Sequence, residues 1–267
     1  MALPVIFSAT PALHASAWLH VAALGSVLVH PPAWPVALSA VVADHLALVA
    51  AGLWPRSRLL GPNWTRLPET SRRRQELAIT LDDGPDPDVT PQVLDLLEAH
   101  GAQASFFVVG TRVAEHPGLG REILRRGHTL ENHSHTHRHD FSLLGPMRLR
   151  REIVRAQDAI AAVGGAARYF RAPAGLRNPF LEGELRRAGL QLVSWTRRGF
   201  DTVNRDAARV HARLSRGLAA GDILLLHDGH AARTSAGNPV VLEALPRLLA
   251  SAQRLGLRAT HLQAALR

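Results

Sequence analysis

The chain has 267 residues, of which 46% are hydrophobic and 20% are charged, which is enough for one large domain with a substantial core. The formal net charge is +9, and every residue counted as positive is Arg, because there is no Lys. Genomic base composition can explain this preference for Arg. The Arg residues are scattered and no nucleic-acid motif accompanies them, so we expect no nucleic-acid partner; an anionic membrane or an acidic glycan fits the charge better. The absence of Cys excludes disulfides and thiolate ligands, so a metal would need His, Asp or Glu.

The beginning of the chain differs from the rest, because Asp44 is the only formal charge among residues 1–54. Two apolar runs, 13–30 and 36–54, are each long enough to span a bilayer as a helix, and a proline-rich break separates them. The pattern therefore predicts a membrane-anchor hairpin, made of two transmembrane helices or of one re-entrant pair.

Two other interpretations of this hairpin are open. A soluble hairpin packed on the domain would avoid placing His14, His20 and Asp44 in lipid. A signal peptide is disfavoured, because residues 1–12 lack the basic start that such peptides have. Residues 55–75 are expected to form a basic linker, and the positive-inside rule then places the following domain on the cytoplasmic side of an inner or plasma membrane.

Short apolar runs alternate with helical patterns over the catalytic domain expected at residues 76–267. Strands are expected at 77–81, 104–109, 128–131, 169–171, 190–195, 222–227 and 258–261. Helices or helical turns are expected between them, at 91–100, 110–126, 146–163, 179–188, 205–218 and 240–255. This alternation indicates an α/β fold with a parallel sheet, and about seven units predict a barrel that is closed or nearly closed, with catalytic groups at the C-terminal strand ends.

Two adjacent carboxylates, Asp82 and Asp83, follow the first expected strand and precede the turn residues Gly84 and Pro85. Two such groups cannot both be ionised and unpaired without cost, so one could bind a cation while the other acts as a base. Taken alone, an ordinary Asp-Gly turn explains this pattern better.

Four His residues occur in the segment 133–139, after the third expected strand. His133 and His137 are four positions apart and would face the same way on a helical turn, and the same holds for His135 and His139. Either pair could bind a metal ion. The alternative without a metal site is that the segment is a solvated polar loop. Asp83 with two His would give a three-ligand site with open positions, which is typical of catalytic zinc or a similar divalent ion.

Three more polar groups fall at strand ends. Arg171 could orient a catalytic carboxylate, and the turn after it, 172–175, could present a backbone N–H to an oxyanion. Asp201 lies in a turn, and His227 ends the most hydrophobic strand, where it could serve as a general acid. Each of these has a plain structural explanation when it is considered alone.

Together and in this order, the clusters resemble those of the polysaccharide deacetylase family, the carbohydrate esterases of family four. The resemblance is carried by TLDDGP at 80–85, HSHTH at 133–137, RAPAG at 171–175 and LLH at 225–227, within residues 76–262. It implies a distorted, incomplete (β/α) barrel. It also implies metal-dependent removal of an N-acyl group, acetyl or formyl, from an amino sugar in a polysaccharide or lipid-linked glycan.

The resemblance further implies a role for individual residues. Asp82 resembles the general base and Arg171 the residue that orients it, whereas His227 resembles the general acid and Asp201 the residue that tunes it. The metal ligands, expected to hold zinc, would be Asp83, His133 and His137. The carbohydrate substrate would contact Leu225, which lines the acyl pocket, together with Ala174 and Gly175.

The sequence departs from the family pattern at Leu81, Ala174 and Thr202, where Phe, Tyr and Trp are usual. The last two changes remove aromatic surface that could stack on a sugar, so a lipid-linked or membrane-proximal amino sugar fits better than crystalline chitin or chitin oligomers. Two alternative functions are an O-acyl glycan esterase and an inactive sugar-binding membrane protein of the same fold.

Overall fold

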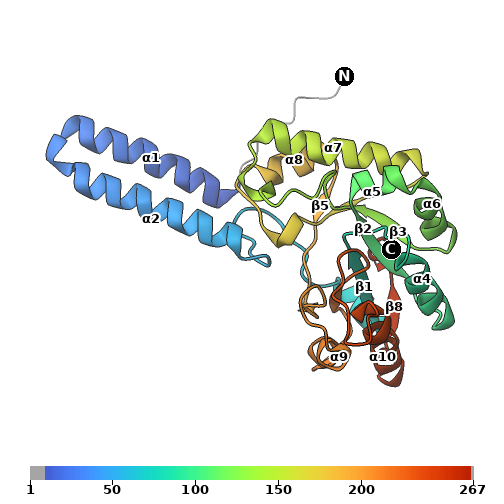
Figure 1. The fold of residues 1–267 in the computed structure, drawn as a ribbon. Helices are drawn as coiled ribbons and strands as arrows, with labels where there is room; N and C mark the ends of the chain where they lie inside the picture. Colours follow the sequence, from blue (N-terminus) through green and yellow to red (C-terminus); the bar gives the residue numbers. More distant parts are fainter. Residues whose placement is uncertain (1–9, 266–267) are drawn as a thin grey trace.

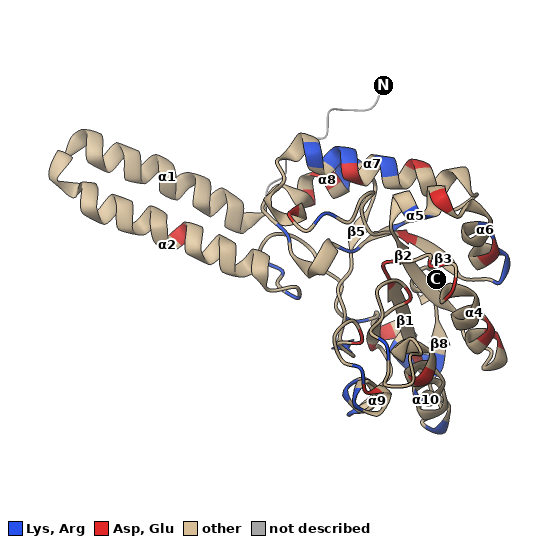
Figure 2. Ribbon diagram, viewed as in Figure 1, with Lys and Arg blue, Asp and Glu red and all other residues tan. Residues whose placement is uncertain are grey.

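The structure, a computed structural model, describes residues 10–265, so the parts of the expected segments at residues 1–9 and 266–267 lie outside it. Figure 1 shows a helical hairpin that projects like an arm from an α/β domain. The hairpin consists of α1 (Pro11–Val29) and α2 (Trp34–Leu53), joined by the short helix η1 (Pro31–Ala33). Both helices are long and apolar enough to cross a membrane, and in Figure 2 the ribbon of the hairpin is almost free of the blue and red that mark Lys, Arg, Asp and Glu.

The polar side chains of the hairpin meet one another between its two helices. Ser16 Oγ donates a hydrogen bond to Asp44 Oδ2 at 2.6 Å, and the rings of His20 and His45 lie 5.1 Å apart in an edge-to-face arrangement. Pairing across the helices satisfies groups that would be costly to leave alone in an apolar medium.

The hairpin and residues 55–75 both contact the domain directly. The Arg177 N–H donates to the Gly52 carbonyl at 3.1 Å, and a Cβ at Gly52 would collide with the Arg177 carbonyl. Farther along, the Trp64 N–H donates to Leu192 O at 3.0 Å, and a short helix, α3 (Glu69–Arg73), precedes the first strand. Residues 55–75 therefore pack along the domain surface.

A parallel sheet forms the centre of the domain. Its strand order is β5-β4-β3-β2-β1-β7-β6, with β8 also paired to β1. All seven strand pairings are parallel, and within residues 10–265 the two ends of the path, β5 and β6, are not paired with each other. The expected incomplete α/β barrel is thus confirmed. The strands are β1 (Glu76–Asp82), β2 (Ala104–Val108), β3 (Thr129–Asn132), β4 (Tyr169–Phe170), β5 (Gln191–Leu192), β6 (Arg197–Arg198), β7 (Ile223–His227) and β8 (Arg258–Thr260).

Helices follow the strands and cover the outside of the sheet (Figure 1). They are α4 (Thr90–Ala99), α5 (Gly110–Glu115), α6 (Pro117–Arg125), α7 (Pro146–Ala162), α8 (Leu181–Arg187), α9 (Ala207–Ser215), α10 (Val240–Arg254) and α11 (Leu262–Ala265), with short 3-10 helices η2 (Phe141–Leu143) and η3 (Pro173–Gly175).

The two central strands are buried on both faces. Along β1, Leu77, Ile79 and Leu81 belong to the main hydrophobic cluster with the covering helices, whereas Ala78 belongs to a smaller cluster inside the barrel. Every residue of β1 and of β7 is buried, which is typical of a parallel strand between two layers. This packing fixes the C-terminal ends of both strands, where Asp82 and His227 stand side by side in register.

Candidate active site

One pocket of about 440 Å³ opens at the C-terminal ends of the strands. All ten residues singled out in the sequence lie at this pocket. Eight of them line it: Asp82, Asp83, His133, His137, Ala174, Gly175, Leu225 and His227. The other two stand behind it, Arg171 against Asp82 and Asp201 against His227.

Asp82 is held by a buried cation. Arg171 Nη1 donates to Asp82 Oδ1 at 2.6 Å, and the side chains of Arg171 and Asp82 are only 1% and 4% exposed. The Arg171 guanidinium also donates to the carbonyls of Val193 and Ser194, and its Cζ lies 4.0 Å from the centre of the Phe107 ring. Burial lowers the pKa of Arg171, and the charge of Asp82 opposes that effect. The guanidinium is thus fixed on all sides, and it directs one carboxylate oxygen away from the pocket.

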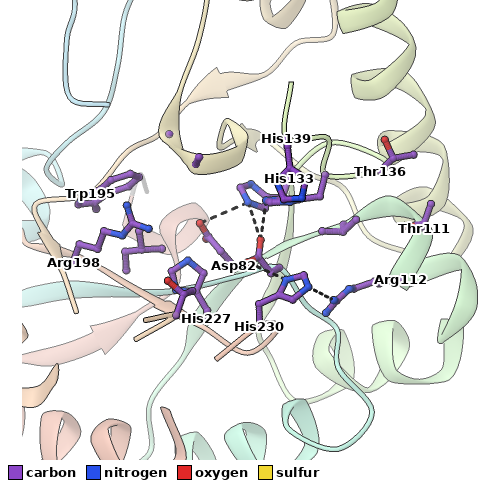
Figure 3. Close-up of a pocket in the computed structure, with 17 residues that line it drawn as sticks. Asp82, Thr111, Arg112, His133, Thr136, His139, Trp195, Arg198, His227 and His230 are labelled. Atoms are coloured by element: carbon purple, nitrogen blue, oxygen red, sulfur yellow. Dashed lines mark hydrogen bonds and ion pairs between the residues drawn. The ribbon is translucent and has the colours of Figure 1, made fainter. Parts of the chain in front are cut away.

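Asp83 lies against two imidazole rings. Its Oδ1 is 3.2 Å from His133 Nε2 and 3.1 Å from His137 Nε2, within the pocket that Figure 3 draws. The ligand atoms of the three residues all lie within 4.8 Å of one another. Three atoms at such spacings fit one face of the coordination shell of an ion whose bonds are about 2.0–2.2 Å long, as for zinc.

Protons occupy the place between these residues that an ion would take. Burial lowers the pKa of His133, but the charges of Asp82 and Asp83 outweigh burial and raise it. His133 Nδ1 donates to the Arg171 carbonyl at 2.8 Å, so Nε2 is the ring nitrogen that faces Asp83. Burial alone would raise the pKa of the Asp83 carboxyl, but hydrogen bonds from three imidazole rings, that of His133 first, hold it far below its usual range. A metal binds an ionised carboxylate and neutral imidazoles, so an ion here would displace the protons that the rings share with Asp83.

The loop that carries the His residues is not helical, whereas the four-residue spacing of His133 and His137 predicts one helical turn. Residues 133–140 form bends and turns, and both Ser134 and His137 have positive φ angles of 64° and 49°. The loop is held by Glu152 of α7, whose carboxylate accepts the backbone N–H groups of His135 and Thr136. This folding brings His133 and His137 together at Asp83.

The second pair of His residues is not brought to Asp83. His135 is buried behind the loop, where its Nδ1 has no hydrogen-bond partner within residues 10–265 and lies against Gly110. His139 lines the rim of the pocket. Although the two pairs have the same spacing in the sequence, only His133 and His137 lie at Asp83.

His227 lies on the other side of Asp82, at the end of β7. Asp201 accepts a hydrogen bond from His227 Nδ1 at 2.9 Å and another from the His227 backbone N–H at 2.7 Å. Burial lowers the pKa of His227, but the charge and hydrogen bond of Asp201 outweigh burial and raise it to about 8. His227 therefore keeps a proton at neutral pH and has Nε2 as the ring nitrogen that can meet a ligand.

The turn η3 forms one wall of the pocket. Ala174 has a φ of 54°, and the Gly175 N–H is used within the turn by the Ala172 carbonyl. A Cβ at Gly175 would collide with the Trp195 ring and with Pro55, so this close approach requires glycine. Leu225, which is 1% exposed, and Trp195 complete an apolar corner of the pocket that also holds the Asp82 and Asp83 carboxylates.

Sequence reasoning missed three cationic or titratable residues at the pocket, Arg112, Arg198 and His230. His230 Nδ1 lies 3.5 Å from Asp83 Oδ2 and Arg112 contacts the other ring nitrogen of His230. A signal existed for two of them, because Arg112 follows the second strand and His230 comes three residues after His227. Arg198 lies on β6, a strand that the sequence did not predict.

Comparison with known proteins agrees with this geometry. The profile of the polysaccharide deacetylase family matches residues 69–193. A peptidoglycan-N-acetylglucosamine deacetylase of Bacillus cereus is 33% identical over 192 residues, covering 71% of this chain and 87% of the relative. A chitooligosaccharide deacetylase of a Bradyrhizobium species is 37% identical over 154 residues, covering 57% of this chain and 70% of the relative.

Solved structures give the same result. A family 4 carbohydrate esterase from Streptomyces lividans, in complex with acetate, superposes with a TM-score of 0.63 at 32% identity, covering 69% of this chain and 91% of that one. A family 4 pseudoenzyme from Bacillus anthracis superposes with a TM-score of 0.68 at 20% identity, covering 77% of this chain and 69% of that one. The second likeness concerns the fold alone.

Proposed function

The chain belongs to the polysaccharide deacetylase family, and we propose that it is a metal-dependent hydrolase that removes the N-acyl group from an amino sugar. The substrate is a polysaccharide or a lipid-linked glycan. The observation that carries this proposal is that one pocket holds three complete units: a carboxylate with its cation, a three-ligand set, and an imidazole with its carboxylate. Relatives named as deacetylases of peptidoglycan N-acetylglucosamine and of chitooligosaccharides support the bond type.

The three-ligand set of Asp83, His133 and His137 is proposed to hold a divalent ion, with zinc as the first candidate. When such an ion is bound, it supplies Lewis-acid polarisation of the acyl carbonyl and makes a water molecule more acidic. The protein's part is to keep Asp83 ionised and to hold the lone pair of His133 Nε2 in place through the Arg171 carbonyl.

Asp82 is proposed to act as the general base. Its Oδ1 is committed to Arg171, so Oδ2, which lies 3.9 Å from His133 Nε2, is the oxygen on the side of the ligand set. Oδ2 takes a proton from water, and the oxygen of that water adds to the acyl carbonyl carbon. Arg171 stabilises the carboxylate form and fixes its direction.

His227 is proposed to act as the general acid on the leaving side. The C–N bond breaks, and the departing nitrogen takes the proton of His227 Nε2, so the products are a free amine and acetate or formate. Asp201 holds the ring through Nδ1 and stabilises its protonated form. Ala174 and Leu225 both line the pocket, and we propose that the backbone N–H near Ala174 holds the developing oxyanion while Leu225 receives the acyl methyl group.

We also propose that residues 1–54 anchor the protein in a membrane. Their two helices have mean hydropathies of 1.5 and 1.9 over their apolar windows, and only 6% and 11% of those windows is buried within the protein. Exposed apolar helices of this length find a stable environment in a bilayer. By the positive-inside rule, the Arg residues that follow favour the cytoplasmic side of an inner or plasma membrane for the proposed catalytic domain, residues 76–267.

The proposal is tested by acyl release from three substrate groups: N-acetylated glycans, N-formylated lipid-linked sugars and O-acetylated glycans. The full chain with added Zn²⁺ should release acid from an N-acyl substrate. Faster release from O-acetylated glycans would favour the esterase alternative, which the same residues could catalyse. A folded, metal-binding protein that releases nothing from any of them would instead support a sugar-binding protein without activity.

A further inference from the structure

Two arginine side chains line the pocket without a part in the proposed reaction. Arg112 belongs to α5 and Arg198 to β6, and they approach the site from different sides. Figure 3 shows Arg198 beside Trp195 on one side of Asp82, and Arg112 beside His230 on the other. The two charges therefore flank the place where the acylated sugar must bind.

Neither arginine has a carboxylate partner in the part of the chain that the structure describes. Arg112 Nη2 contacts His230 Nε2 at 3.1 Å, and a Cβ at Gly229 would collide with Arg112 Nη1. The guanidinium of Arg198 lies over the rings of Phe200 and Trp195, with its Cζ 4.9 Å and 5.4 Å from the ring centres. An imidazole nitrogen and two aromatic rings thus contact these cations at the pocket.

Some other arginines of the domain do have carboxylate partners. Arg126, for example, makes ion pairs with Asp95, Glu98 and Glu122. An arginine whose charge served only solubility would not need to line the pocket that also holds Asp82, Asp83 and His227. Arg198 also lies four residues before Thr202, where the usual aromatic residue of the family is missing.

The charges within the pocket do not neutralise these two cations. Asp82 is paired with Arg171, and a divalent ion would more than balance Asp83. The loaded groove would therefore carry a net positive charge, which attracts anions and disfavours cationic ligands. Arg binds carboxylate and phosphate with two parallel hydrogen bonds, so such groups are its natural ligands.

We propose that Arg112 and Arg198 form an anion-recognising rim that selects glycans with a carboxylate or phosphate group next to the acylated amino sugar. This inference rests on the proposed function and names the substrate class of the same site. Charge recognition takes the place of the aromatic stacking that Ala174 and Thr202 have lost. A neutral chitin-type oligomer would leave both guanidinium groups at the groove without an anionic partner.

The test compares kcat/KM of the full, metal-loaded chain for three N-acylated substrates of similar size. One carries a carboxylate on the neighbouring sugar, one is linked through phosphate to a lipid, and one is a neutral oligomer. We expect an anionic substrate to be preferred at least tenfold over the neutral one, and the preference to shrink as salt rises. Preference for the carboxylate or for the lipid phosphate identifies which anion the rim serves.

Variants assign the preference to the two residues. Arg112→Gln and Arg198→Gln should each reduce the ratio of anionic to neutral kcat/KM roughly tenfold, mainly through KM. Arg121→Gln, on the exposed side of α6, removes the same charge far from the pocket and should leave the ratio unchanged. An equal preference for neutral and anionic substrates, or equal effects of all three variants, would overturn the proposal.

A binding measurement tests the anion-recognising rim independently of the proposed hydrolase activity. Dissociation constants of the same glycans are measured with the His227→Ala variant, which cannot complete turnover. Tighter binding of anionic glycans that is lost in Arg112→Gln supports the rim even if no substrate is hydrolysed. Turnover with no charge preference in either assay refutes the rim and leaves the hydrolase proposal intact.

Discussion

Asp201 accepts two hydrogen bonds from His227, one from the backbone N–H at 2.7 Å and one from ring Nδ1 at 2.9 Å. The first contact fixes the end of β7, and the second fixes the orientation and tautomer of the ring. Asp201 is fully buried, so its charge acts through a medium that screens it weakly. One carboxylate thereby sets both the position and the proton affinity of the proposed general acid.

The pH dependence of activity should report this contact. Burial lowers the pKa of His227, but Asp201 raises it to about 8, so the protonated acid is present below that pH and is lost as the pH rises through it. The alkaline limb of kcat/KM should lie near pH 8, and Asp201→Asn should move it to lower pH. Asp206→Asn, which changes the exposed N-cap of α9, should leave the limb in place. An unchanged limb in Asp201→Asn would contradict the assignment.

Arg171 should be needed for stability as well as for activity. Arg171→Met leaves the carboxylate of Asp82 buried without its cation, and loss of one partner of a buried pair costs about 3–5 kcal/mol. The free energy of unfolding, measured with urea, should fall by about this amount. Arg121→Met at an exposed position should change it by less than about 0.5 kcal/mol. If Arg171→Met unfolds like the unmodified chain, Asp82 does not depend on the pair.

Asp82→Asn should separate catalysis from metal binding. The amide cannot accept the proton from water, so kcat should fall by about 10²–10⁴. Zinc stoichiometry, measured by elemental analysis, should stay the same because Asp82 is not among the three ligands. Asp88→Asn serves as a matched control, since that side chain is exposed and contacts none of the proposed machinery. Near-full activity of Asp82→Asn would show that another group is the base.

The central strands of the domain could be predicted from the sequence, because each one is marked by an apolar run within its own residues. The apolar runs of β1 and β7 are continuous, as strands buried on both faces must be, and each ends in a polar residue that reaches the pocket. Short strands at the sheet edges were harder. β6 consists of Arg197 and Arg198 only, and nothing in two charged residues indicates a strand.

The geometry of the His loop could not be predicted from spacing alone. Its shape depends on Glu152, which lies more than a dozen residues later and accepts N–H groups from the middle of the loop. A four-residue separation implies a shared face only within a helix, and this loop is not helical. The resemblance to a known family selected His133 and His137, and the structure brings those two rings to Asp83.

The hairpin should bind lipid bilayers through its apolar surface. The full chain should float with vesicles in a density gradient and stay bound at high salt, because the driving force is burial of apolar helices. Replacing Leu24, Leu28 and Val36, which are all more than 60% exposed, by Asn should release it. Arg121→Gln should float like the unmodified chain. Vesicle binding that disappears at high salt would indicate surface attraction instead of insertion.

The most direct test of the account is zinc titration of the chelator-treated full chain, with release of acetate or formate from an N-acylated amino sugar as the readout. We predict that chelation abolishes release and that about one equivalent of Zn²⁺ per chain restores it. His133→Ala should neither bind the ion nor release acid, whereas His139→Ala, changed in the same loop, should bind it. Full release by a chain shown to contain no metal, or by His133→Ala, would contradict the proposed mechanism.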